Sequence, residues 1–557
     1  MSAATPHVLA VDLGTSGPKV GLVSERCEIT ASAFVPVAMR LVEGGGAEQD
    51  AEEWWRAVIS ATREVLELSG VDRGAVLGIA CTGQWSGTVA VDERGTPLAR
   101  AITWMDSRGS ALVAERVRGR GMTILGYGPR KLLRWVRLTG GAPGLSGKDP
   151  LAHILFMREA MPGVYASAYK FLEPVDYLNM RLTGKAVSSY DSIALHWVTD
   201  NRKLGSVRYD AKLLEMAGLE RSKLPDLVAP CTVIGRLMAA RAAEMGLRSG
   251  IPVVTASGDL HSAIMGAGRP GYFEPHLYIG TSSWITCHVP FKKTDAAHNL
   301  GSLPAALPGR YLVADEQETA GACLTFLADR LLFASDGAAD GGGELGRPEN
   351  GPGRPENVYR ALDDLAARAP VGSGKVMFTP WLNGERSPVD DRTMRAGLHN
   401  VSLSTTRADV VRAVFEGVAL NSRWLLEAVE RFCGRRFADI SFIGGGALSD
   451  IWSRIHADVM GKRVCQLAQP DLANLRGAGV LALITLGRAR LEDVPAMVQQ
   501  KAVYEPDPEA GRIYDERFGE LINLYRRTKR LHQRLNRDAG QPRHKGQSRH
   551  KGQPVGS

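Results

Sequence analysis

Apolar residues near the start of the chain fall into two short runs separated by a turn. Residues 8–11 form the first run, which ends at Asp12, and residues 20–23 form the second. Between them, residues 14–18 read Gly-Thr-Ser-Gly-Pro. This pattern predicts a β-hairpin. Taken alone, it fits an ordinary edge hairpin about equally well, because short glycine-rich motifs also occur by chance.

The tip of this predicted hairpin has the chemistry of an anion site. Thr15 and Ser16 offer hydroxyl groups, and consecutive backbone N–H groups form a small positive concavity. The Asp12 carboxylate at the end of the first strand can hold Mg²⁺ beside a phosphate. Lys19, on the returning strand, can reach the same charge. The first hairpin is therefore a candidate phosphate site.

A second strand-turn-strand pattern occurs at residues 277–289, with Gly280 and Thr281 in its turn. Just before it, an apolar run at residues 251–257 leads into Gly-Asp, which places Asp259 at the end of another predicted strand. Two similar hairpins far apart in the chain suggest two similar half-molecules that face one nucleotide.

Polar and aromatic side chains follow two predicted strands of the first half. The strand at residues 76–81 leads into a loop that holds Gln84 and Trp85, and the segment 101–108 holds Trp104. Open α/β folds place ligands at such strand ends, and a stacking face with donors and acceptors suits a polyhydroxylated substrate. By residue type alone, packing of these tryptophans in a core is the more common outcome.

Periodic apolar positions predict helices in both halves. One helix begins after Asp50, which is an N-cap candidate with Glu53 as its capping-box partner. A long amphipathic helix spans residues 407–425, and a last helix runs to about residue 537. Residues 334–357 are rich in Gly, Pro and Asp and predict an exposed, mobile insertion.

Three glycines follow a predicted strand at residues 440–443, and a helix opens after them. Gly445 and Gly446 let the backbone approach a flat ligand closely. Asp450, in the opening of that helix, can bond a purine or a ribose. This turn is a candidate nucleoside site.

Length and composition limit the class of protein. A chain of 557 residues exceeds one ordinary core, so two large domains are expected. The net charge is +8, of which Arg543, Lys545, Arg549 and Lys551 supply four, and the remaining +4 does not indicate nucleic-acid binding. Seven scattered cysteines without CxxC spacing favour free thiols in a reducing cytosol. No signal peptide or membrane span is predicted, which favours a cytoplasmic protein.

Two conspicuous patterns carry no chemistry in this interpretation. Residues 266–271 fit GxGxxG but lead into a strand rather than a helix, so they do not match a dinucleotide fingerprint. His261 and His276 are interpreted as ordinary loop residues rather than metal ligands, because the histidines show no HExxH spacing.

The order of these motifs resembles the FGGY family of carbohydrate kinases, from about residue 7 to about residue 530, and within it the xylulokinases. The resemblance rests on Asp12-Leu-Gly-Thr-Ser, Gly258-Asp259, Gly280-Thr-Ser-Ser, Ala320-Gly-Ala and Gly444-Gly-Gly-Ala. It implies an α/β fold with two actin-like (ribonuclease H-like) ATPase domains around a central cleft. We expect an N-terminal domain at residues 1–262, a C-terminal domain at 263–537 and a disordered basic tail at 538–557.

The resemblance also implies roles for single residues. Asp259 would be the general base, and Asp12 would orient Mg²⁺. Gln84, Trp85 and Trp104 would bind the acceptor together with Asp259. ATP would be bound by Thr15, Ser16, Lys19, Gly280, Thr281, Gly321, Gly445, Gly446 and Asp450.

The expected activity is ATP-dependent phosphorylation of a sugar hydroxyl, with a pentulose such as D-xylulose as acceptor. Xylulokinases usually read Gln-Met-His-Gly where this chain has Gln84-Trp-Ser-Gly, and Asn where it has Leu260. A kinase for another ketose, a polyol or an aldonate therefore stays an alternative, as does an actin- or Hsp70-like ATPase that binds a protein partner. The expected partners are sugar and ATP, without nucleic acid or membrane, and a homodimer is possible.

Overall fold

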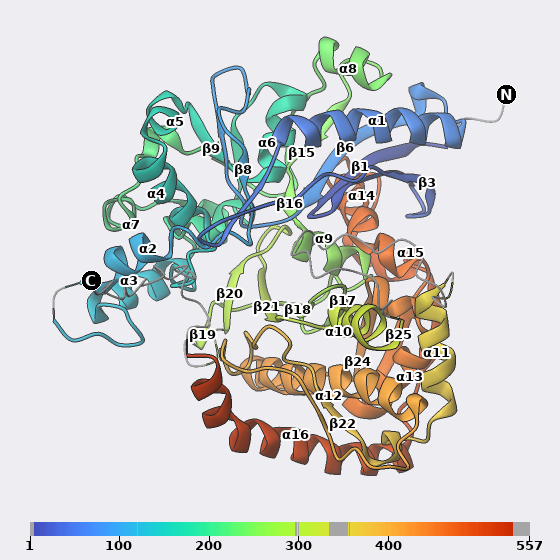
Figure 1. Ribbon diagram of the computed structural model, residues 1–557. Helices are drawn as coiled ribbons and strands as arrows, with labels where there is room; N and C mark the ends of the chain where they lie inside the picture. The colour runs from blue at the N-terminus through green and yellow to red at the C-terminus, as the bar shows by residue number, and fades with distance from the viewer. Residues whose placement is uncertain are drawn as a thin grey trace, which may run out of the picture.

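The computed structural model describes residues 5–119, 121–295, 298, 300–333, 355 and 357–537. A mixed β-sheet forms the centre of each half of the chain, and helices pack against both sheets (Figure 1). In Figure 1 the N-terminal half lies above, the C-terminal half lies below, and α9 lies between them.

Both sheets follow the same plan, in which an antiparallel hairpin is extended on one side by parallel strands. In the first sheet, β1 pairs antiparallel with β2 and parallel with β6. In the second sheet, β17 pairs antiparallel with β18 and parallel with β24. The repeat confirms the predicted pair of similar half-molecules.

The spatial order of the strands differs from their order in the sequence in both sheets. The first sheet runs through β14 (Val233–Arg236), β15 (Pro252–Val254), β6 (Val76–Gly83), β1 (His7–Gly14), β2 (Gly17–Ser24) and β3 (Ile29–Phe34), with β16 (Ser257–Gly258) also paired to β6. The second runs through β19 (Thr294–Asp295), β20 (Leu300–Pro304), β21 (Tyr311–Gln317), β18 (Ser283–Val289), β17 (His276–Ile279), β24 (Asp439–Ile443), β25 (Arg463–Leu467) and β26 (Gln500–Tyr504).

The helices that matter for the site come from both halves. They are α1 (Ala51–Ser69), α3 (Pro129–Thr139), α4 (Pro150–Ala160), α6 (Pro174–Thr183), α8 (Ala239–Met245), α9 (Asp259–Gly266), α10 (Gly321–Phe326), α12 (Arg407–Cys433), α13 (Asp450–Met460), α14 (Ala473–Thr485) and α16 (Pro508–Leu535).

The first predicted hairpin is present. Asp12 on β1 lies opposite Lys19 on β2, and Thr15 and Ser16 form the turn. Gly17 has a φ of 138°, and a Cβ on it would lie 2.1 Å from the carbonyl oxygen of Val35. Only glycine fits there without displacing the neighbouring chain, so this turn requires a glycine at position 17.

The capping of α1 differs from the prediction. Asp50 is its N-cap, as expected, but the carboxylate accepts from the backbone N–H of Glu52 at 2.9 Å. The structure therefore does not show the predicted capping box with Glu53. An aspartate can satisfy the N2 position as well as N3, so the helix start is still capped.

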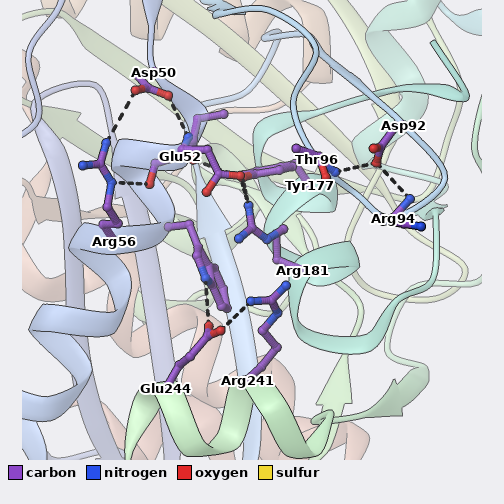
Figure 2. A network of polar contacts seen from close by, with 12 residues as sticks. Asp50, Glu52, Arg56, Asp92, Arg94, Thr96, Tyr177, Arg181, Arg241 and Glu244 are labelled. Atoms are coloured by element: carbon purple, nitrogen blue, oxygen red, sulfur yellow. Dashed lines mark hydrogen bonds and ion pairs between the residues drawn. The ribbon is translucent and has the colours of Figure 1, made fainter. Parts of the chain in front are cut away.

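A polar network joins α1 to α6 and α8, as Figure 2 shows. Arg181 on α6 forms an ion pair with Glu52 on α1. Glu244 on α8 accepts a hydrogen bond of 3.3 Å from the indole N–H of Trp55. Because α1 also packs on β2 and β3, these contacts support the hairpin that carries Asp12.

Helices α9 and α14 pack closely against each other where the two halves of the chain meet. α14 comes from the C-terminal half of the chain, yet it packs on β1, β2 and β6 of the first sheet and against α9. The two helices pack closely because each presents a glycine to the backbone of the other. A Cβ on Gly266 of α9 would lie 1.8 Å from the carbonyl oxygen of Ala473 on α14. A Cβ on Gly477 would lie 1.8 Å from that of Ser262.

Other predicted elements are confirmed with small changes in their ends. α12 covers the predicted helix at 407–425 and continues to Cys433, with a Thr406–Asp409 capping box at its start. α16 ends at Leu535. All seven cysteines are free. Among the residues described, no helix has the length and apolar character that a bilayer crossing requires. Nearly all of the predicted insertion at 334–357 and the whole tail at 538–557 lie outside the described residues.

Candidate active site

Strand pairing brings Asp12 and Asp259 to the same edge of the first sheet. Asp12 on β1 lies beside Thr82 on β6, and Thr82 lies beside Ser257 on β16. Asp259 follows two residues later, as the first residue of α9. The carboxyl ends of parallel strands are where open α/β sheets bind ligands. The structure therefore places the two predicted acids at the expected position.

The two acids influence each other electrostatically. Burial raises the pKa of Asp12 from 3.8 to about 6, while Lys19 acts in the opposite direction. Burial raises the pKa of Asp259 from 3.8 to about 7, and the charges of Asp12 and Glu316 add to this shift. Like charges resist ionising together in a poorly solvated place. Such a site favours the uptake of a proton or the binding of a cation near these carboxylates.

Residues of the second half reach the same place. The charges of Asp12 and Asp259 both raise the pKa of Tyr278 on β17, after the larger effect of burial. The Tyr278 ring stacks on Trp284 of β18, with centroids 3.8 Å apart. Glu316 on β21 also acts on Asp259. The site therefore lies where the ends of both sheets meet.

The tip of the first hairpin has well-defined partners. The Thr15 hydroxyl accepts from the Trp104 indole N–H at 3.0 Å, and the Thr15 carbonyl accepts from Gln49 at 2.8 Å. Ser16 is exposed at the turn. Lys19 donates to the carbonyl oxygen of Asp471 at 3.0 Å, which links the hairpin to the second half.

The predicted acceptor residues are adjacent but differ in their environments. Gln84 donates to Gln49 at 3.0 Å, while its own buried carbonyl oxygen has no hydrogen-bond partner among the described residues. Trp85 is 8% exposed and donates to the carbonyl oxygen of Ser192 at 2.9 Å. Trp104 is half-buried. Trp85 therefore packs largely as a core residue, whereas Gln84 and Trp104 keep polar or exposed surface.

The second hairpin meets the start of α10. Backbone N–H groups of Gly321 and Ala320 donate to the carbonyl oxygens of Gly280 and Thr281, both at 2.9 Å. The Thr281 side chain is exposed at this turn. Gly280, Thr281 and Gly321 are thus brought together, as predicted for one side of a nucleotide site.

The predicted nucleoside turn is divided between two environments. Gly445 faces open space, while a Cβ on Gly446 would lie 2.6 Å from Ile279. Asp450 is the first residue of α13, and its carboxylate is already engaged by Lys501 and by Gln466, the latter at 2.9 Å. Gly445 is therefore the member of this turn that a ligand can approach most closely.

Two histidines lie elsewhere than predicted. His261 is inside α9 and His276 begins β17, and both are buried rather than loop residues. His261 packs edge-on against Trp85, with ring centroids 5.0 Å apart. Groups of three or more potential metal ligands do not occur within the described part of the chain.

Sequence reasoning missed several residues of this site. Gln49 joins Thr15 to Gln84, Tyr278 and Glu316 approach from the second half, and Lys148 lies near Trp104. Gln49 directly precedes Asp50, the predicted helix N-cap, and this position only weakly indicates the end of a strand. Tyr278 lies in the second predicted hairpin without a predicted role, and Glu316 and Lys148 belong to no motif. Only the three-dimensional packing brings these residues to the site.

Comparison with known proteins supports one family. Residues 7–266 match the N-terminal domain of the FGGY family of carbohydrate kinases, and residues 277–486 match its C-terminal domain. The chain belongs to the FGGY family of carbohydrate kinases. It is therefore a sugar kinase, and ATP is the phosphate donor of this family.

Similar FGGY proteins span more than one substrate. Xylulose kinase from Staphylococcus epidermidis is 26% identical over 527 residues, covering 94% of this chain and 97% of that protein. Gluconokinase from Bacillus licheniformis is 24% identical over 526 residues, covering 94% and 96%. The structure of gluconate kinase from Lactobacillus acidophilus has a TM-score of 0.80 at 21% identity, covering 96% and 100%. These matches confirm the predicted actin-like fold and leave the domain limits of 262 and 263 as a prediction.

Proposed function

We propose that this FGGY kinase transfers the γ-phosphoryl group of Mg-ATP to a hydroxyl group of a pentulose, with D-xylulose as the first candidate. The observation that carries the proposal is the Asp259 carboxylate beside Asp12, at the junction of the two sheets. Several relatives that cover nearly the whole chain are named xylulose kinase, which supports the choice of acceptor.

Asp259 acts as the general base in this proposal. A sugar hydroxyl is a weak nucleophile at neutral pH, and a carboxylate within hydrogen-bond reach accepts its proton as the phosphoryl group moves. The raised pKa makes Asp259 a stronger base than an ordinary aspartate. Gln84, Trp85 and Trp104 are proposed to hold the acceptor beside it.

The remaining predicted residues are proposed to hold the nucleotide. Asp12 fits a magnesium ligand, because its carboxylate has no hydrogen-bond or ion-pair partner among the described residues, and Mg²⁺ is often held by one carboxylate with phosphate and water. When bound, Mg²⁺ would neutralise phosphate charge there. ATP would contact the two hairpins and the third turn through Thr15, Ser16, Lys19, Gly280, Thr281, Gly321, Gly445, Gly446 and Asp450.

The decisive experiment is an ADP-release assay with Mg-ATP and a panel of pentuloses, hexuloses, polyols and aldonates. We expect ADP release to require a sugar and to be fastest with a pentulose. ADP release that is the same with and without sugar would instead indicate an ATPase that serves a protein partner. Mass spectrometry of the product identifies the phosphorylated acceptor.

The pH dependence of the reaction should report Asp259. A base must be unprotonated, so kcat/KM should fall about tenfold per pH unit below about pH 7, where the Asp259 carboxyl takes up its proton. Removing the neighbouring negative charge with Asp12→Asn should move this limb to lower pH in the residual activity, because Asp12 raises the pKa of Asp259. A wild-type profile that stays flat down to pH 5.5 would contradict this assignment.

A further inference from the structure

The loop that carries Gln84 is held by an acid from a distant part of the first half. This loop spans residues 84–88 and directly follows β6. Glu173, at the start of α6, reaches it with its carboxylate, and Oε2 accepts from the backbone N–H of Gly87 at 3.1 Å. Glu173 is 1% exposed, so water cannot readily replace this contact.

Both ends of the loop bond to neighbouring backbone, whereas its middle bonds to this side chain. The N–H of Gln84 donates to the carbonyl oxygen of Leu13 at 2.8 Å, and the N–H of Thr88 donates to that of Ile102 at 2.8 Å. A buried backbone N–H that loses its acceptor is unfavourable. The position of the middle of the loop therefore depends on where the Glu173 carboxylate lies.

The loop backbone adopts a conformation that needs such support. Ser86 has a φ of 68°, in the left-handed region that is uncommon for residues other than glycine. Its hydroxyl donates to the carbonyl oxygen of Lys148 at 2.9 Å. Gly87 lies against Pro174 so closely that a Cβ on it would lie 2.5 Å from the proline ring. Conformations of this kind persist where their surroundings hold them in place.

Glu173 holds the loop instead of its own helix. It is the N-cap residue of α6, but its side chain makes no capping hydrogen bond there. Asp50, at the same position of α1, does accept from its own helix. Aspartate is a preferred N-cap, whereas glutamate is not among the preferred residues. The longer side chain of Glu173 reaches outward, to a partner 86 residues away in the sequence.

The other oxygen of Glu173 lies beside an uncharged ring. Oε1 has no hydrogen-bond partner in the part of the chain that the structure describes, and Nδ1 of His196 is 3.8 Å from it. Burial lowers the pKa of His196 to about 3. Burial also raises the pKa of Glu173 well above its ordinary value, and the charge of Asp176 adds to this shift, while the N–H of Gly87 opposes it. The loop thus requires an oxygen acceptor at a fixed reach rather than a negative charge.

The loop places two side chains beside the proposed base. Trp85 packs against Gly258, where a Cβ would lie 2.9 Å from the indole ring, and Gly258 directly precedes Asp259. Gln84 is 2% exposed, and its carbonyl oxygen has no hydrogen-bond partner within the described residues. A buried amide oxygen is satisfied when a ligand supplies a donor, and a sugar hydroxyl is such a donor.

We propose that Glu173 is a positioning residue of the acceptor site, which holds the N–H of Gly87 so that the amide of Gln84 meets the acceptor. The inference rests on the proposed function, because Gln84 is proposed there to hold the acceptor. It follows that the length of the side chain at position 173 matters for acceptor binding, whereas its charge does not.

The test separates length from charge with two conservative variants. Glu173→Asp keeps the charge but is one methylene shorter, and its carboxylate should cap α6 as Asp50 caps α1, which leaves Gly87 without its acceptor. Its KM for D-xylulose should rise about tenfold, as expected for loss of one buried hydrogen bond, while the Kd for ATP stays within about twofold. Glu173→Gln keeps an oxygen at the same reach, so its KM for D-xylulose should stay within about threefold of the wild type. The measurements are sugar-dependent ADP release and equilibrium binding of ATP.

A double-mutant cycle shows whether Glu173 acts through Gln84. In the Gln84→Ala background, Glu173→Asp should change the KM for D-xylulose by less than about threefold, because the residue that it positions is already lost.

Glu430→Asp is the matched control for the shortened side chain. Glu430 is also buried and also accepts from a backbone N–H, that of Phe437 at 2.7 Å, but it lies on α12 in the second half. This variant should keep the wild-type KM for D-xylulose.

Four results would overturn the inference and leave the proposed function standing. The first is an unchanged sugar KM in folded Glu173→Asp, and the second is a Glu173→Gln variant as impaired as Glu173→Asp. The third is a parallel loss of sugar and ATP affinity with a lower thermal midpoint, which would show a merely structural role. The fourth is a tenfold effect that persists in Gln84→Ala. If no acceptor stimulates ADP release by the wild type, the proposed function fails, and this inference fails with it.

Discussion

Asp259→Asn should yield a folded protein that binds ATP but transfers phosphate at least about a hundredfold more slowly, in line with loss of a general base. The asparagine keeps the size and most of the hydrogen bonding of the aspartate, including an acceptor for the N–H of Leu260. It cannot take the proton of the acceptor hydroxyl. The measurement is sugar-dependent ADP release at saturating ATP, together with the Kd for ATP.

The stability of this variant separates chemistry from folding. The pKa of Asp259 is raised to about 7 in the native state, so its ionisation destabilises the fold as pH rises from about 4 to above 7. The amide side chain of the variant does not ionise in this range. The thermal midpoint of Asp259→Asn at pH 8 should therefore equal or exceed that of the wild type, and the difference should shrink towards pH 4.

Asp226→Asn is the matched control, because this aspartate is exposed on β13 (Asp226–Val228) and forms an ion pair with Arg221 at the surface. It should keep wild-type turnover. Near-normal turnover in Asp259→Asn would contradict its role as base. A loss of ATP binding together with a lower thermal midpoint would show that the side chain is structural.

The sequence predicted those parts of the site that depend on neighbours along the chain. The first hairpin, the strand before Asp259 and the glycine turn before Asp450 each combine an apolar run with a turn of small residues. The constraint is local: Gly17 is required because its Cβ would meet Val35, which directly follows the next strand of the same sheet. Such patterns fix an element and the residue at its end.

The contacts between the halves could not be predicted in this way. Tyr278, Glu316 and Lys148 approach the site from elements that are far apart in sequence. The positions of Tyr278 and Glu316 depend on how the two sheets are oriented, and that of Lys148 depends on how its loop packs beside Trp104. No spacing in one segment encodes either arrangement. The role of a residue also depends on its contacts. The Asp450 carboxylate already forms an ion pair with Lys501 and accepts a hydrogen bond from Gln466, which its place in a motif does not reveal.

Gly266 shows how a local pattern can hide a long-range constraint. It begins a GxGxxG sequence that does not match a dinucleotide-binding fingerprint, and its local sequence predicts no other role for it. In the structure it touches α14, whose Gly477 in turn touches α9. A glycine inside a helical pattern lowers helix propensity by about 1 kcal/mol relative to alanine, so its presence often indicates close packing.

Gly477→Ala should therefore destabilise the protein strongly, although alanine is the better helix former. The new Cβ would lie 1.8 Å from the carbonyl oxygen and 2.6 Å from the carbonyl carbon of Ser262. These are backbone atoms of a packed helix, which cannot rotate away as a flexible side chain can. Overpacking commonly costs about 1–3 kcal/mol and sometimes more. We expect the upper end or beyond, seen as a lower thermal midpoint and a lower urea midpoint.

Gly519→Ala provides the comparison, because Gly519 lies within α16 and a Cβ there would meet nothing within 4 Å. It should be neutral or stabilising by up to about 1 kcal/mol. The crossing also connects stability to catalysis: Ser262 is on the helix that begins with Asp259. The folded fraction of Gly477→Ala should thus lose turnover as α9 shifts. Equal midpoints for the two variants would show that α9 and α14 do not pack this closely in solution.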